Sequence, residues 1–338
     1  MKIIASMSAI VLLVAILNVT TAQRDTSVSS LGAPCDVFTP GQNTPENSAT
    51  SDRQNADIAN SDNRTPEEQP AVRVNDLSEN KSAPLMMSEI SENLYVVTGD
   101  GGNVAIQVTT EGAVLVDNKF SRNHDKLTAC VARVTNLPIK YMIGTHHHAD
   151  HMGGNPSLST ETLIVAHDNA RANMIAGNQP APPAVVFSSK TSLFLGDSTI
   201  DIHHFGNGHT NGDSVVLFTE HRVLHTGDLF VEGLPFIDYA NGGNSADWVD
   251  TLGGILTLDF DTVVPGHGPI LVKRDLQTFR DRLITLRIRT LQLIQRGLTQ
   301  QQTLAQLETT DLGWTLTSGS LFVRRSFPDF YKELLDEL

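Results

Sequence analysis

The chain has 338 residues and a formal net charge of −14, from 38 acidic and 24 basic residues. Nucleic acids and anionic lipid surfaces are polyanions, so this charge argues against both as partners and favours an uncharged or cationic small-molecule substrate. The length could hold one large domain or two small ones, and the pattern along the chain decides between them.

The first 22 residues have the pattern of a secretory signal. Lys2 precedes an apolar run from Ser8 to Val19, and residues 20–22 are small enough for a cleavage site. A retained membrane anchor is the alternative, but the run is short for a spanning helix of about 20 apolar residues. The sequence therefore predicts export to a periplasm or the outside, with no stable membrane span after cleavage.

Residues 23–84 are rich in Ser, Asn, Thr, Asp, Glu, Gln and Pro and poor in aliphatic residues. Such a composition buries too little apolar surface to offset chain entropy, so it predicts a disordered spacer. Residues 85–338 then form one domain with a helical C-terminal extension. Cys35, in the spacer, could pair with Cys130 in an exported protein, but we expect such a bridge to contribute little, and neither cysteine is placed to bind zinc.

Short apolar runs separated by glycine-containing turns open the folded part. Residues 94–97, 104–108 and 113–116 read as strands, and Asp117 closes the third. An amphipathic helix follows, because apolar residues recur at i, i+3, i+4 and i+7, namely Leu127, Cys130, Val131 and Val134. A further strand over residues 139–143 leads into a cluster of histidines.

The second half of the domain contains more strands and fewer helices. Helices are predicted over 168–176 and around 248–256, and strands over 163–166, 185–187, 193–195, 200–204, 214–218, 222–225 and 262–264. Gly297 ends a long helix whose apolar positions are Leu276, Phe279, Leu283, Leu286 and Ile288. Because strands and helices do not alternate strictly, we expect an α/β (α+β) fold of two mixed sheets with helices outside.

The histidine cluster at residues 145–151 contains H-x-H-x-D-H at the end of a predicted strand. Side chains alternate along a strand, so His146 and His148 can face one side while His147 points away into an outer-shell or packing role. A further turn of loop lets Asp150 and His151 face a neighbouring point. The segment therefore indicates two adjacent metal positions, although a solvated histidine loop is the plain alternative.

Three later loops repeat the design of a strand followed by a metal-capable side chain. Residues 206–213 supply His209, residues 224–228 supply Asp228, and residues 264–269 supply His267. Glycines in each loop let the backbone approach a compact site closely. Thr210 and Asp213 are expected to form loop-shaping hydrogen bonds, and His225 is expected to support Asp228.

Taken in order, these segments resemble the metallo-β-lactamase superfamily of metal hydrolases over residues 92–268. The resemblance implies a four-layer αββα sandwich with the site at one edge. By motif position it implies first-metal ligands His146, His148 and His209, and second-metal ligands Asp150, His151 and His267. It also implies that Asp228 bridges the two metals, and that the catalytic residues are Asp150 and Asp228.

This donor set suits two Zn²⁺ per chain, since three imidazoles bind zinc and leave a position for water. Two ions together would provide a bridging hydroxide near neutral pH. The predicted function is an exported dinuclear zinc hydrolase that cleaves an ester, thioester, lactone or β-lactam-type bond. The alternative is an iron-dependent redox enzyme similar to persulfide dioxygenases. Nothing in the sequence indicates an oligomeric state.

Members of this family with a cysteine in the second site are β-lactamases that bind the substrate carboxylate through a lysine. Here Asp228 takes the cysteine position, and residues 231–235 contain no lysine. The resemblance therefore disfavours that subclass and leaves the identity of the scissile bond open.

Overall fold

The computed structural model describes residues 35–38 and 84–338. The predicted signal at 1–22 lies outside the described residues, as does most of the predicted spacer. Within the described ranges, no helix has the length and apolar character needed to cross a membrane. The predicted domain boundaries therefore stay predictions.

The first sheet has eight strands that lie in the order of the chain. They are β1 (Asp36–Phe38), β2 (Met86–Ser91), β3 (Leu94–Thr98), β4 (Val104–Val108), β5 (Ala113–Val116), β6 (Ile139–Ile143), β7 (Leu163–His167) and β8 (Val185–Phe187). Strands β2 to β5 pair antiparallel, whereas β5 to β8 pair parallel. Strand β2 was not predicted, because its sequence MMSEIS is half polar and has a single β-branched residue, Ile90.

The second sheet has six strands in the order β14-β13-β12-β11-β10-β9. They are β9 (Lys190–Leu195), β10 (Ser198–His203), β11 (Val215–Phe218), β12 (Val223–His225), β13 (Thr262–Val264) and β14 (Leu271–Val272). Only the β12–β13 pair is parallel. Both sheets are therefore mixed, as predicted.

Seven α-helices lie within the described residues: α1 (His124–Val134), α2 (Ala149–Met152), α3 (Asp168–Ala176), α4 (Ser245–Ile255), α5 (Lys273–Gln295), α6 (Gln300–Gln306) and α7 (Phe327–Asp336). Helix α5 ends just before Gly297, whose φ of 79° only glycine adopts readily. The predicted apolar stripe of α5 is correct at four positions and wrong at Ile288, which is 50% exposed. The helix turns 100° per residue, so position 288 leaves the face that 279, 283 and 286 share.

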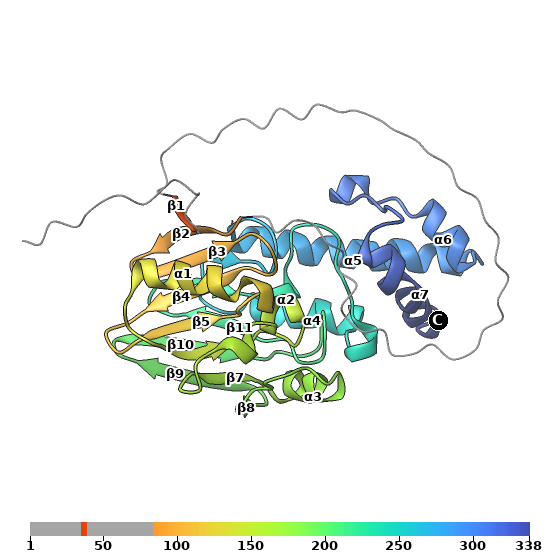
Figure 1. Ribbon diagram of the computed structural model, residues 1–338. Helices are drawn as coiled ribbons and strands as arrows, with labels where there is room; N and C mark the ends of the chain where they lie inside the picture. Colours follow the sequence, from red (N-terminus) through yellow and green to blue (C-terminus); the bar gives the residue numbers. More distant parts are fainter. Residues whose placement is uncertain (1–34, 39–83) are drawn as a thin grey trace, which may run out of the picture. The chain divides into compact units, whose positions relative to one another are not determined.

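The two sheets stack between helices (Figure 1), and three apolar layers fill the spaces between these elements. Val96 and Val114 of the first sheet pack with Val216 of the second, so one layer lies between the sheets. Alternate residues of the same strands point the other way, and on the outer face of the first sheet they pack against α1. The outer face of the second sheet packs against α4 and α5. This order of layers confirms the αββα sandwich.

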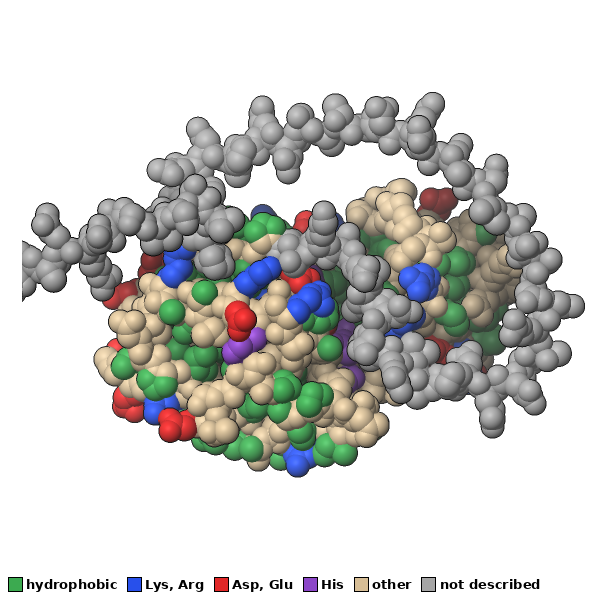
Figure 2. Space-filling model, viewed as in Figure 1, with side chains coloured by type: hydrophobic (Ala, Val, Ile, Leu, Met, Phe, Trp, Pro, Cys, Tyr) green, Lys and Arg blue, Asp and Glu red, His purple; other side chains and the backbone are tan. Residues whose placement is uncertain are grey.

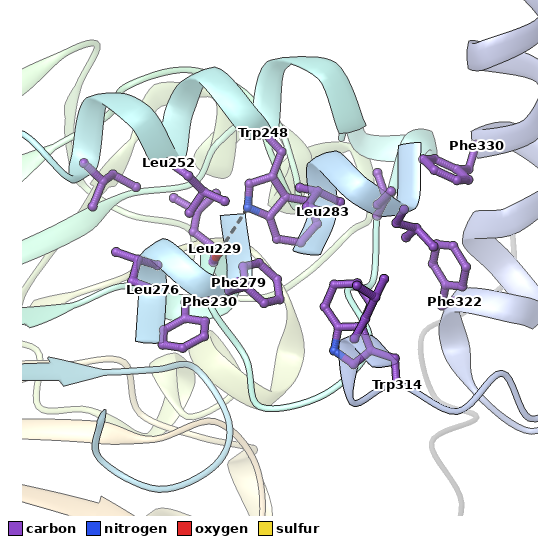
Figure 3. Packing of buried hydrophobic residues seen from close by; sticks show 14 of the residues in the cluster. Leu229, Phe230, Trp248, Leu252, Leu276, Phe279, Leu283, Trp314, Phe322 and Phe330 are labelled. Carbon is purple, nitrogen blue, oxygen red and sulfur yellow. Dashed lines mark hydrogen bonds between the residues drawn. The ribbon is translucent and has the colours of Figure 1, made fainter. Parts of the chain in front are cut away.

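The C-terminal helices belong to the third of these layers. Figure 3 shows Trp248 of α4 and Phe279 of α5 beside Trp314, Phe322 and Phe330 from the last part of the chain. The Trp248 indole donates a hydrogen bond of 3.0 Å to the carbonyl of Leu229. The extension therefore shares its core with the helices that cover the second sheet, and it does not form a separate apolar cluster.

A disulfide joins Cys35 to Cys130 of α1. Cys35 is 2% exposed and belongs to the apolar layer between α1 and the first sheet. Strand β1, which follows it directly, pairs parallel with β2. Little was expected of this pair because Cys35 lies in the predicted spacer, and the structure corrects that expectation: residues 35–38 are attached to the domain through the disulfide and through strand pairing.

Candidate metal centre

Loops from both sheets bring the candidate residues to one edge of the sandwich. The histidine cluster follows β6, His209 lies between β10 and β11, Asp228 follows β12, and His267 follows β13. The Ser214 amide donates to the Thr145 carbonyl at 2.8 Å and so ties the loop of the second sheet to that of the first. Asp150 and His151 lie in the short helix α2, where a turn of loop was expected.

The first group of donors consists of three imidazoles that face one another. His148 Nδ1 lies 3.1 Å from His146 Nε2 and 2.9 Å from His209 Nε2. Asp228 Oδ2 is 3.6 Å from His209 Nε2 and 3.9 Å from His146 Nε2. These four residues could hold one metal ion.

The second group lies on the other side of Asp228. His267 Nε2 is 3.1 Å from Asp150 Oδ2 and 3.3 Å from His151 Nε2. The remaining Asp228 oxygen, Oδ1, is 3.1 Å from His151 Nε2 and 3.4 Å from His267 Nε2. The structure thus brings all seven predicted residues together, with one Asp228 oxygen facing each group.

The ring nitrogens that face away from the two groups are held by hydrogen-bond acceptors. His151 Nδ1 donates to Asp117 Oδ2 at 2.6 Å, and His209 Nδ1 donates to the Phe236 carbonyl at 2.6 Å. His148 Nε2 donates to Asp238 Oδ2 at 2.9 Å. Because each bond fixes the proton on the outer nitrogen, the inner nitrogen keeps its lone pair, which is the tautomer that binds a metal.

His146 follows the same pattern through a hydroxyl group. Thr145 Oγ1 donates a hydrogen bond to Asp117 Oδ2 at 2.8 Å, so its lone pair can accept a hydrogen bond from His146 Nδ1 at 3.1 Å. Three inner lone pairs about 3 Å apart repel one another unless a cation lies between them. Zinc bound at ~2.0–2.1 Å in tetrahedral geometry would separate its nitrogen ligands by roughly 3.3 Å, which is close to the observed spacing. The first group therefore fits zinc.

Asp228 gives a second indication of fit. Its Oδ1 is buried and has no hydrogen-bond partner of acceptable geometry among the described residues. A buried carboxylate oxygen without a donor is costly unless a cation neutralises it. The second group supplies the position for such a cation, because Oδ1 faces His151 and His267.

Burial and charge set the protonation of individual histidines differently, and within the first group, despite burial, the Asp238 carboxylate raises the pKa of His148. Burial lowers the pKa of His209 to about 4, so its imidazole is neutral and able to bind metal at neutral pH. Burial also disfavours charge on His267, but the neighbouring Asp228 and Asp150 carboxylates outweigh it and raise the His267 pKa to about 9. A metal ion in the second group would take the place of that proton.

Asp117 and Asp238 hold candidate ligands in place, and the sequence did not reveal them. Asp117 directly follows β5 with a φ of 63°, and that placement after a buried strand was the only local signal. Asp238 and Phe236 lie in a loop without a motif. The Phe236 ring stacks on His148 with centroids 5.8 Å apart, so this loop contacts the first group through backbone, carboxylate and ring.

His147 lies outside both donor groups, and strand β6 already ends at Ile143. It is buried, and its Nε2 lies 4.0 Å from Asp238 Oδ2. Its Nδ1 has no hydrogen-bond partner within the described part of the chain. With His148 and Asp238 it forms a third cluster of donors. Its outer-shell or packing role stays a prediction.

The loop between β3 and β4 holds the second group in place. The Gly102 amide donates to the Asp150 carbonyl at 3.0 Å, and a side chain at Gly102 would overlap the His151 ring. Asn103 Nδ2 donates at 2.9 Å to the carbonyls of Pro265 and Gly268, on both sides of His267. Buried Lys119 donates to the Gly102 carbonyl at 2.7 Å, and burial lowers its pKa to about 8.

Two predictions about supporting residues have different outcomes. Thr210 does shape its loop, because its amide and hydroxyl donate to Asp213 at 2.8 and 2.5 Å. His225 was expected to support Asp228, but its Nε2 lies 3.0 Å from the Asn103 carbonyl and its Nδ1 accepts from the Gly227 amide at 3.2 Å. His225 therefore fixes the backbone beside Asp228 and not its carboxylate.

A cavity of about 300 Å³ opens beside the second group and gives access to it. Its lining is His267 together with uncharged residues, namely Thr98, Gly99, Gly101, Asn103, Gly268 and Pro269. The His267 side chain is 40% exposed, whereas those of His146 and His209 are 1% exposed. On the face drawn in Figure 2, histidine side chains reach the surface, and one of them lies directly beside an acidic side chain.

A family model described as the metallo-beta-lactamase superfamily matches residues 97–267, about half of the chain. The matched range contains all seven residues of the two groups. The chain belongs to the metallo-beta-lactamase superfamily. It is accordingly a metal-dependent hydrolase.

Relatives with a described activity include two different kinds of enzyme. The metallo-beta-lactamase type 2 of Bacillus cereus is 28% identical over 208 residues, which cover 56% of this chain and 79% of that protein. The alpha subunit of 2,4-dinitroanisole O-demethylase from Nocardioides sp. (strain JS1661) is 24% identical over 204 residues, covering 57% of this chain and 61% of that subunit.

Solved structures agree with the fold. The DIM-1 metallo-beta-lactamase superimposes with a TM-score of 0.54 at 19% identity, covering 61% of this chain and 99% of that one. The metallo-beta-lactamase FIM-1 from Pseudomonas aeruginosa, in its mono-zinc form, gives 0.53 at 20% identity, covering 60% and 96%. At these identities the likeness shows the shared αββα fold.

Proposed function

We propose that this protein is an exported dinuclear zinc hydrolase that cleaves an ester, thioester, lactone or β-lactam-type bond. The observation that carries the proposal is Asp228, whose two carboxylate oxygens face two separate donor groups. One carboxylate with this geometry can hold two cations close together. Export rests on the signal pattern of residues 1–22.

In this proposal His146, His148 and His209 hold the first zinc ion, and Asp150, His151 and His267 hold the second. The two ions would supply an acidified water molecule and polarise the substrate carbonyl oxygen. Asp228 fixes the spacing of the two groups. Asp150 is also the proposed acceptor of a proton from the attacking water, and its side chain is 16% exposed.

The surroundings of the second group favour an uncharged or cationic substrate. The cavity beside His267 is lined by uncharged side chains, and the nearby segment 229–235 contains Glu232 but no lysine or arginine. The Glu232 amide donates to the His267 carbonyl at 3.0 Å, which places this acidic residue at the rim of the site. A substrate with its own carboxylate would be repelled there.

Zinc is the metal proposed for these donors. Four of the seven residues are imidazoles with the metal-binding tautomer fixed, a set that suits zinc. The FIM-1 relative is described in a mono-zinc form. No specific contact favours the iron-dependent redox alternative.

The test combines metal analysis with a substrate panel. Purified mature protein is expected to bind about two zinc ions and to hydrolyse at least one member of a panel of uncharged esters, thioesters, lactones and β-lactams. His267→Ala is expected to lose one ion and His209→Ala the other, whereas His124→Ala at the half-buried start of α1 should keep both. A single ion that is insensitive to His267→Ala would refute the dinuclear proposal, and bound iron with substrate-dependent oxygen consumption would support the redox alternative.

A further inference from the structure

The C-terminal helices contact the loop that orients the first group of histidines. We propose that this extension positions the first metal site through Ser326 and Glu333, two residues far outside the family match at residues 97–267. The inference rests on the proposed function, because it takes His146, His148 and His209 to be metal ligands. Ser326 and Glu333 are positioning residues, since neither touches a donor nitrogen.

The loop at residues 236–238 is the connecting element. The Phe236 carbonyl, at the start of the loop, accepts a hydrogen bond from His209 Nδ1. The Asp238 carboxylate, at its end, accepts a hydrogen bond from His148 Nε2. The Asp238 amide also donates to the His209 carbonyl at 2.9 Å. A shift of this loop would therefore turn two of the three imidazoles of the first group.

Ser326 holds the middle residue of that loop on both sides. Its hydroxyl accepts from the Ile237 amide at 2.9 Å and donates to the Ile237 carbonyl at 3.1 Å. Both residues are buried, with Ser326 at 0% and Ile237 at 1% exposure. Removing the hydroxyl would leave two buried backbone groups without this partner. Because unpaired buried polar groups are costly, the loss would favour a shift of the loop.

Glu333 of α7 holds the residues that follow the loop. Its carboxylate accepts from the Tyr239 hydroxyl at 2.5 Å, from the Ser245 hydroxyl at 2.8 Å and from the Ala246 amide at 3.0 Å. The last two contacts lie in the first turn of α4, where a helix favours negative charge. Arg287 of α5 donates to the same carboxylate at 2.6 Å and balances its charge.

The extension is itself fixed by apolar packing. Phe322, Phe327, Phe330 and Leu334 are each at most 1% exposed and belong to the same cluster as Ile237 and Trp248. Figure 3 shows Phe322 and Phe330 next to the α4 and α5 residues that cover the second sheet. A rigid support can hold a metal-binding loop to a narrow range of positions, which raises the affinity of the site.

The test measures the affinity of the first site alone. Every variant is made in the full-length mature His267→Ala chain, so that the second group is disabled, and Zn²⁺ is titrated against a chromophoric chelator. Ser326→Ala and Glu333→Gln are expected to weaken binding roughly 10-fold, at the lower end of what loss of outer-shell support costs. Each is also expected to change the visible spectrum of one bound Co²⁺, which reports the ligand geometry.

Matched controls lie in the same extension. Ser320→Ala removes a hydroxyl that bonds only to its neighbouring turn, and Glu337→Gln removes the other carboxylate that Arg287 contacts. Both should keep the zinc affinity within about 2-fold of that of the parent chain, and both should leave the cobalt spectrum unchanged. Melting temperatures of all variants are measured in parallel, so that a loss of zinc affinity can be told apart from a general loss of stability.

The outcomes separate this inference from the proposed function. If the His267→Ala chain binds no ion, or binds one that His209→Ala does not release, the metal site itself is wrongly assigned. If His209→Ala does release the ion but Ser326→Ala and Glu333→Gln behave like their controls, the site stands and the positioning role is refuted.

Discussion

The two donor groups differ in how completely the protein encloses them. In the first group His146 and His209 are 1% exposed, and every ring has an outer partner that fixes its tautomer. In the second group, His151 alone has such a partner among the residues that the structure describes, and this partner is Asp117. His267 is 40% exposed beside a cavity. One bridging carboxylate, Asp228, joins the two.

Similar donors can therefore have different roles within one centre, according to how far the protein encloses them. A closed, supported group should bind its ion tightly and keep it during turnover. An open group next to a cavity should exchange its ion more readily and should be the one that meets the substrate.

Removal of both ions should have the largest effect. Dialysis against a chelator is expected to abolish hydrolysis and to lower the melting temperature. The donors come together only in the folded state, so bound ions stabilise that state. An ion present at 1,000 times its Kd contributes about 4 kcal/mol of stability. Readdition of Zn²⁺ should restore activity and melting temperature together, and full activity after chelation would contradict a metal-dependent reaction.

Asp228→Asn should have the next largest effect, because it removes the charge that both groups share but keeps the size of the side chain. Turnover on the best substrate is expected to fall at least ~10²-fold, the scale of other electrostatic deletions in active sites. Circular dichroism should stay unchanged, because the sheets depend on their apolar layers. Near-normal turnover with two ions still bound would show that Asp228 does not bridge.

Changing the two supporting aspartates should affect the groups differently. Asp238→Asn is expected to weaken the first ion alone, by roughly 10- to 100-fold. Asp117→Asn is expected to weaken both ions, because Asp117 holds His151 directly and His146 through Thr145. Each asparagine keeps a hydrogen-bond acceptor but loses the charge that favours the outer proton. Stepwise zinc titrations of the two variants check the assignment, and it fails if Asp238→Asn weakens the second step or if Asp117→Asn leaves the second step unchanged.

Cys130→Ser should have the smallest effect on the centre. Loss of a cross-link between residues 95 apart is expected to lower the free energy of unfolding by about 2–4 kcal/mol. The disulfide lies between α1 and β1, so zinc affinity should change less than 2-fold. Urea unfolding and zinc titration of the same preparation measure both quantities, and a large loss of zinc affinity would mean that the disulfide supports the centre.

Local patterns made much of the fold and the ligand set predictable. Strand alternation and the H-x-H-x-D-H spacing depend on residues close in sequence, so His146, His148, Asp150 and His151 could be grouped from the chain alone. The helix at 168–176 matched α3 because its start and end are also set locally. His209, Asp228 and His267 needed the ordered set of motifs, since each by itself is a common turn.

The rest depends on contacts between distant parts of the chain. Asp238 lies 90 residues from His148, and Cys35 lies 95 residues from Cys130, so no local pattern could pair them. The support from Ser326 spans 89 residues to Ile237. Ile288 was misplaced for a different reason: an apolar residue near a stripe was counted as part of it, although the helix turns it to solvent.

Anomalous diffraction from zinc-loaded crystals, collected on both sides of the zinc absorption edge, tests the central claim most directly. The account predicts two peaks about 3.5–4 Å apart, one among His146, His148 and His209 and the other among Asp150, His151 and His267, with the Asp228 carboxylate between them. A single peak at full zinc loading, or two peaks that both lie on the same side of Asp228, would contradict it.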